Sequence, residues 1–164
     1  MINDRFYMQT INRDWLWGLL RLFIGWIFFW AFLDKLFGLG FNTATGQSWL
    51  AGVSPTAGFL KFGSHGPLSG VYQAMAGSGL VDWLFMLGLA GIGLGLMLGI
   101  MVRLAAWGGL VLVGLMYLAR LPPEHNPILD EHIVYALVLI GLAMRSSEGW
   151  WARTKLARKY PWLA

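Results

Sequence analysis

The sequence has no cysteine among its 164 residues. Disulfide bonds, thiolate metal sites and cysteine-based redox chemistry are therefore excluded within this chain. If the protein takes part in sulfur chemistry, the sulfur must belong to a substrate or to a partner. The absence of cysteine leaves the cellular compartment undecided.

Charged residues are scarce as well. Asp, Glu, Lys and Arg make up 12% of the chain, whereas hydrophobic residues make up 57%. A soluble domain carries about 25% charged residues, because polar groups must cover its surface. The composition therefore predicts an integral membrane protein whose partner is the lipid bilayer. The ten Trp and five Tyr residues agree with this prediction, since such rings favour the headgroup region of a membrane.

Four apolar stretches predict an all-α membrane protein, a bundle of four transmembrane helices. A helix needs about 20 apolar residues to cross the hydrocarbon core. We expect the first span to be retained, because it lacks the short apolar core and the cleavage site of a secretory signal. The predicted helices cover about 15–37, 81–101, 104–121 and 128–147, preceded by a polar segment, 1–14, and followed by a basic tail, 148–164.

The fourth predicted helix is short for a span. Its uninterrupted apolar run, 133–144, rises about 18 Å, whereas the hydrocarbon core is ~30 Å thick. Flanking residues must therefore enter the membrane. Either Asp130, Glu131 and His132 lie near or below the outer surface, or the segment 146–151 completes the span.

The long connection between the first two helices, 38–79, is rich in Gly, Ser, Pro and Thr. A loop of this length rarely lacks structure of its own. The segments 48–62 and 68–76 are apolar enough to form short helices at the membrane interface. Pro55 and Pro67 supply breaks beside them.

Four spans place both termini and the turn at Arg103 on the same side. That side holds most of the Lys and Arg residues, whereas the other side has Lys35, Lys61 and Arg120. The positive-inside bias predicts a multi-pass protein of a prokaryotic cell membrane with both termini in the cytoplasm. The basic tail, 148–164, would act as a cytoplasmic anchor and accounts for most of the net charge of +4. We therefore predict no nucleic-acid partner.

Most titratable residues gather on the outer side in this topology. Tyr117 and Arg120 are three residues apart and Glu131 and Tyr135 are four apart, so each pair shares a helix face. If both faces turn inward, the cluster would suit a quinone headgroup or a small anion. Alternatively, these residues brace the loops through ion pairs, such as Arg120 with Asp130 or Glu131. The candidate site residues are Asp34, Lys35, Tyr117, Arg120, Asp130, Glu131, His132 and Tyr135.

Glycines at every fourth position form a stripe in the second predicted helix. Gly91, Gly95 and Gly99 would let another helix approach closely, either within this bundle or from a second copy of the chain in a homo-oligomer. Arg21 lies inside the first span, where it either snorkels to the cytoplasmic surface or has an internal role. The histidines lack a metal-ligand spacing, so we predict no metal.

Four segments resemble the DoxX/DoxD family of small membrane proteins. The similarity covers about 15–141, nearly the whole membrane domain, and implies a four-helix fold. The segments are 25–36 (GWIFFWAFLDKL), 54–60 (SPTAGFL), 121–127 (LPPEHNP) and 129–137 (LDEHIVYAL).

The resemblance also implies a role as a subunit of thiosulfate:quinone oxidoreductase. In that family enzyme, DoxD works with a second subunit, DoxA, to oxidise thiosulfate to tetrathionate and to reduce a membrane quinone. It implies quinone as a non-covalent cofactor and a separate soluble redox partner for any catalytic role. The alternative is a non-catalytic accessory or scaffold subunit of a larger respiratory or photosynthetic complex.

Overall fold

The computed structural model describes residues 2–123, 126 and 128–145, with side chains from Trp15 onward. Every regular element in these residues is helical, which confirms the predicted all-α class. The predicted end of the fourth helix and the basic tail, 148–164, lie outside the described residues. The elements are α1 (Ile2–Phe37), η1 (Trp49–Ala51), η2 (Phe59–Gly63), α2 (Ser69–Met75), α3 (Gly79–Leu98), α4 (Val102–Ala119) and α5 (Glu131–Arg145).

Three helical segments are long and apolar enough to cross a membrane. They are Trp15–Phe37 in α1, Gly79–Leu98 and Val102–Ala119. This finding agrees with the expectation of a membrane protein. The 15 described residues of α5 rise about 22 Å, which is less than the ~30 Å of the hydrocarbon core. The count of four spans therefore stays a prediction.

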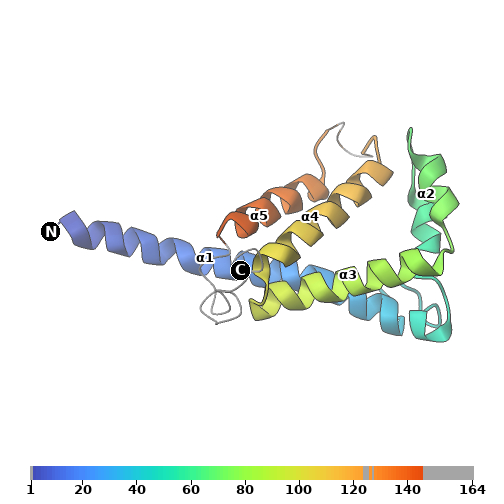
Figure 1. Cartoon of the computed structure of the whole chain (residues 1–164), viewed down its shortest axis with the longest axis horizontal. Coiled ribbons are helices and arrows are strands. Elements are labelled where there is room, and N and C mark those ends of the chain that lie inside the picture. The colour runs from blue at the N-terminus through green and yellow to red at the C-terminus, as the bar shows by residue number, and fades with distance from the viewer. Residues whose placement is uncertain (1, 124–125, 127, 146–164) are drawn as a thin grey trace.

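The helices pack as two pairs that diverge from a common turn (Figure 1). In one pair α1 runs along α3, and in the other α4 runs along α5. The chain passes from α3 to α4 through left-handed residues, Gly99 (φ 70°) and Met101 (φ 51°). Gly99 ends α3 by donating its N–H to the carbonyls of Gly95 and Leu96, which reverses the chain within a few residues. Away from this turn, α3 and α4 separate like the arms of a V.

Two glycines bring α1 and α3 into close contact. A Cβ atom at Gly93 would lie 2.7 Å from the backbone nitrogen of Phe29, and one at Gly25 would lie 2.9 Å from Cγ of Met97. Real Cβ atoms do not approach backbone so closely. The small residues therefore allow backbone-to-backbone packing, which is a main source of helix association in lipid.

The predicted stripe divides among different environments. A Cβ atom at Gly95 would lie 3.0 Å from the Cβ of Ala105 in α4, so this position packs against the partner helix. At Gly91 a Cβ atom would meet no described atom within 4 Å. Gly99 forms the α3 C-cap, with the Arg21 guanidinium against it. The position suits Arg21, because cations are stabilised beside helix C-termini.

We expect Gly93→Ala to destabilise the protein by about 1–3 kcal/mol, because the new methyl group must push α1 away from α3. Gly91→Ala is the matched control: it places the same methyl group on the same helix, where space is open. There, removal of a helical glycine should be neutral or slightly stabilising. Thermal unfolding of both variants in detergent tests the pair, and equal shifts would show that Gly93 does not set the α1–α3 distance.

The connection 38–79 joins α1 to α3 along the chain. In space it bridges the gap between the start of α3 and the end of α4, at the wide end of the V (Figure 1). Its short helices, η1, η2 and α2, lie within or overlap the two segments expected to be helical. The hydroxyl of Tyr72 in α2 donates to the carbonyl of Leu115 in α4 at 2.9 Å. The His65 backbone N–H donates to the carbonyl of Ala119 at 2.7 Å. These contacts fasten the connection to the C-terminal end of α4.

Candidate functional site

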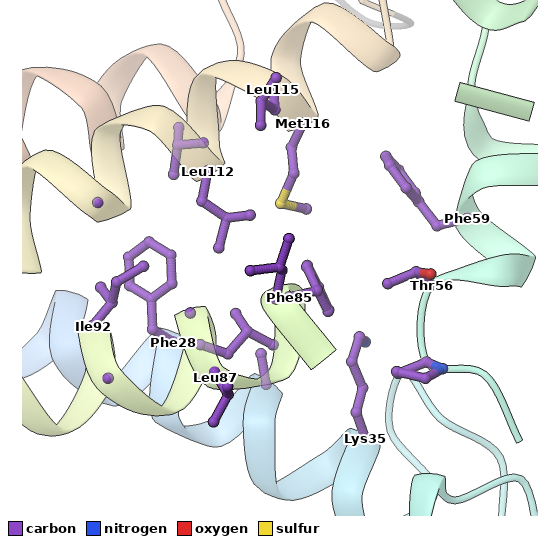
Figure 2. A pocket seen from close by; sticks show the side chains of 18 of the residues that line it. Phe28, Lys35, Thr56, Phe59, Phe85, Leu87, Ile92, Leu112, Leu115 and Met116 are labelled. Atoms are coloured by element: carbon purple, nitrogen blue, oxygen red, sulfur yellow. The ribbon is translucent and has the colours of Figure 1, made fainter. Parts of the chain in front are cut away.

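A large cleft fills the V between α3 and α4. Its volume is about 1530 Å³, and Figure 2 shows the side chains that line it. The inner end, near the α3–α4 turn, is apolar, with Leu98, Met101 and Leu104 on its walls. Towards the middle, the walls include Phe28, Leu87, Ile92, Leu112 and Met116.

The connection 38–79 forms the roof at the wide end of the cleft. Thr56 and Phe59 point towards the cleft from this segment (Figure 2). The roof is held by the buried carboxylate of Asp82, in the first turn of α3. Its Oδ1 accepts hydrogen bonds from the hydroxyls of Ser54, at 2.8 Å, and Thr56, at 2.5 Å. Hydrogen bonds to an ionised acceptor are among the stronger ones in proteins.

Lys35 brings a positive charge to the wide end of the cleft, opposite the α3–α4 turn. Its side chain extends from the last turn of α1 into the cleft (Figure 2). Within the described part of the chain, the ammonium group forms neither a hydrogen bond nor a salt bridge. The neighbouring Asp34 carboxylate attracts this charge but accepts no hydrogen bond from it among the described residues. A half-buried ammonium group without a hydrogen-bond acceptor is costly at membrane depth. The site therefore suits a ligand that supplies an oxygen acceptor.

His132 lines the opposite wall and is 6% exposed. Its Nδ1 lies 2.8 Å from Oδ2 of Asp130, and its backbone N–H donates to Oδ1 of the same residue at 3.0 Å. Asp130 thus caps α5 and orients the imidazole ring. Because an ionised carboxylate only accepts hydrogen bonds, Nδ1 carries a hydrogen. Nε2 has no hydrogen-bond partner among the residues that the structure describes.

The structure brings part of the predicted cluster together. Lys35, Arg120, Glu131, His132 and Tyr135 all line the cleft.

The other predicted site residues, Asp34, Tyr117 and Asp130, do not line the cleft. The Tyr117 hydroxyl donates to the carbonyl of Ile128 at 2.7 Å and so ties α4 to the start of α5. Asp34 is 1% exposed; its Oδ1 accepts from the Phe41 N–H at 3.3 Å, and its Oδ2 has no partner within the described residues. Asp130 bonds to His132, which does line the cleft.

The expected ion pair of Arg120 with Asp130 or Glu131 stays a prediction. Both oxygens of Asp130 contact His132, which makes Glu131 the more available acid. Ligand atoms of Asp130, Glu131 and His132 also lie within 4.8 Å of one another. Two of these three side chains already bond to each other, so we base no metal site on the cluster.

Sequence reasoning missed the roof contacts. Ser54 and Thr56 belong to the segment 54–60 that resembles the DoxX/DoxD family, but nothing in the sequence pairs them with Asp82, which is 26 residues or more away. The available signal was a carboxylate in the first turn of an apolar helix. A charge at such a position is costly unless water or hydrogen-bond donors surround it. Such a residue implies hydroxyl or amide donors nearby.

Searches against protein-family models, curated proteins and solved structures gave no match for this chain.

Proposed function

We propose that this protein is the membrane subunit of a quinone-linked oxidoreductase and that the α3–α4 cleft binds the quinone. The observation that carries this proposal is a long apolar cleft with polar side chains at its outer end only. An isoprenoid quinone has the matching form, a polar ring on a long hydrocarbon chain. The resemblance to the DoxX/DoxD family supports a thiosulfate:quinone oxidoreductase in particular.

The size of the cleft favours a ligand with a chain. Pockets for compact small molecules measure about 300–1,000 Å³, and this cleft holds about 1530 Å³. The apolar inner part would bury isoprene units, each methylene contributing about 0.8 kcal/mol. At the outer end, Lys35, His132 and Tyr135 would hold the ring. Tail burial supplies affinity, whereas these polar groups supply selectivity.

The proposed topology has four spans and cytoplasmic termini, with the roof of the cleft on the outer side of a prokaryotic cell membrane. In this arrangement α5 crosses the membrane with help from flanking residues, and the short helices of the connection 38–79 lie at the outer interface. The exposed apolar side chains of Phe62 and Val71, which are 81% and 60% exposed, support contact of this connection with lipid.

Single introduced cysteines can test this topology by chemical labelling. There is no background labelling from native cysteines, because the chain has none. Thr45 and Arg103 are both exposed, one in the outer connection and one at the α3–α4 turn. In intact cells, Thr45→Cys should react with an impermeant maleimide, and Arg103→Cys should react only after the membrane is opened. The reverse pattern would place the wide end of the cleft in the cytoplasm.

Electron transfer would require a separate redox partner, because this chain has no cysteine for an iron–sulfur or disulfide centre. Purification from native membranes tests this part of the proposal. A small complex with a soluble redox protein, carrying thiosulfate:quinone reductase activity, is the expected result. Isolation within a large respiratory or photosynthetic assembly, without quinone bound to this chain, would instead support the accessory or scaffold role.

A further inference from the structure

Residues from two different walls meet the outer end of the cleft. Lys35 belongs to α1, which packs on α3, and His132 belongs to α5, which packs on α4. Because α3 and α4 are the two arms of the V, Lys35 and His132 belong to helices on different sides of the cleft (Figure 1). The Lys35 ammonium group and the His132 ring nitrogen Nε2 are both without a hydrogen-bond partner among the described residues.

We infer that Lys35 and His132 bind the two carbonyl oxygens of one para-quinone ring, and that Asp130 positions His132 for this contact. The inference rests on the proposed function and deepens it. The two carbonyls of a para-quinone point in opposite directions from the ring. A site with donors on facing walls therefore matches this ring better than a headgroup whose acceptors all lie at one end, such as a phosphate.

Asp130 determines how His132 can act. The carboxylate accepts from Nδ1 at 2.8 Å and is held in turn by the His132 backbone N–H at 3.0 Å. With Nδ1 engaged, only Nε2 is left for the ligand, and it donates to a carbonyl when the ring is protonated. Asp130 does not line the cleft, so it acts through His132 as a positioning residue.

Other charged groups also line the outer end. Arg120 comes from the end of α4 and Glu131 from the first turn of α5. Both belong to the α4–α5 side of the cleft, as His132 does. They leave Lys35 as the cation of the α1–α3 wall at this end, which is why we assign the two carbonyls to Lys35 and His132.

Infrared spectroscopy of bound quinone tests this assignment. The full chain is reconstituted in lipid nanodiscs with an asymmetrically substituted para-benzoquinone that has a short isoprenoid chain. The quinone is labelled with ¹³C at one carbonyl or at the other, so the two stretching bands are separated. In the wild-type protein we expect both bands to shift to lower frequency, relative to nanodiscs without protein, because both oxygens accept hydrogen bonds.

Substitutions should remove these shifts one at a time. Lys35→Met should restore the free frequency of one carbonyl and His132→Phe that of the other, each weakening binding by about 10-fold or more. His132→Gln retains an N–H donor and should keep most of the shift. Asp130→Asn should reduce the shift of the His132-bound carbonyl alone, which a purely structural role would not do.

The outcomes separate the inference from the proposed function. If the quinone binds the wild-type protein but its carbonyl bands are unshifted, or if both substitutions affect the same carbonyl, the two-wall assignment is wrong and the cleft still binds quinone. If the quinone does not bind the wild-type protein at all, the proposed function is wrong and the assignment fails with it. Helix content by circular dichroism identifies any variant that fails to fold, and His132→Gln then decides the His132 contact.

Discussion

Gly91→Phe is expected to weaken quinone binding by about 10-fold or more while leaving the protein folded. Gly91 lies on the cleft wall, and a side chain there would meet no described atom within 4 Å. The benzyl group would therefore enter the space assigned to the isoprenoid chain. Loss of the chain contacts is worth about 1.5–3 kcal/mol, so affinity should fall by about 10-fold or more. Titration of the reconstituted protein with a short-chain quinone measures this change.

Gly114→Phe provides the matched control for this substitution. Gly114 is also a helical glycine with open space around it, but it does not line the cleft. We expect this variant to bind quinone with the wild-type affinity, because its new side chain would face away from the proposed site. Equal losses in the two variants would mean that binding depends on general helix packing and not on the cleft.

Asp82→Ala is expected to release the roof of the cleft and to lower the free energy of unfolding by about 2–4 kcal/mol. The substitution removes the acceptor for two hydroxyls, and that of Thr56 belongs to a buried residue, 5% exposed. An unpaired buried hydroxyl is costly because water cannot replace the lost partner. Hydrogen exchange across 53–60, with thermal unfolding, measures both effects.

Partial substitutions decide whether Asp82 acts through these hydroxyls. Ser54→Ala and Thr56→Val each remove one donor and should each cost less than Asp82→Ala. Combined with Asp82→Ala, they should add little further loss, because contacting residues are not additive. If Thr56→Val destabilises the Asp82→Ala variant as much as it does the wild-type protein, the hydroxyl and the carboxylate do not act as a pair.

Sequence patterns were sufficient for the fold class, because membrane helices are specified by long apolar runs. Runs of about 20 apolar residues have few other stable arrangements, since backbone groups in lipid must bond within their own segment. The long connection was harder to predict. Its short helices depend on contacts such as that of Tyr72 with Leu115, which joins residues far apart in the sequence.

Glycine spacing predicted a packing stripe but not which neighbour each glycine meets. Gly91 and Gly93 lie on the same helix, yet Gly93 touches α1 and Gly91 faces the cleft. The difference arises because residues two apart are turned by about 200° around a helix, which places the two glycines on nearly opposite faces of α3. Which of these faces meets a neighbouring helix and which faces the cleft depends on how α3 and α4 diverge from the turn at Gly99 and Met101, and no repeat in the sequence encodes that divergence.

The candidate site was partly accessible from the sequence. Charged residues at the ends of spans, such as Lys35 and Arg120, are costly enough to indicate a polar environment by themselves. The pairing of Asp130 with His132 was not predicted, because the two residues are neighbours on one turn and their orientation depends on how α5 begins. The cleft itself was not predictable, since it results from the separation of two helices.

Photoaffinity labelling tests the central claim, that the α3–α4 cleft binds an isoprenoid quinone, most directly. A quinone with a photoreactive group on its isoprenoid chain is irradiated with the reconstituted protein, and labelled residues are located by mass spectrometry. The account predicts labels on cleft residues such as Leu87, Leu112 and Met116, and their loss when unlabelled quinone competes. Labels on the exposed face of α1, at Phe23 and Trp26, that persist under competition would contradict it.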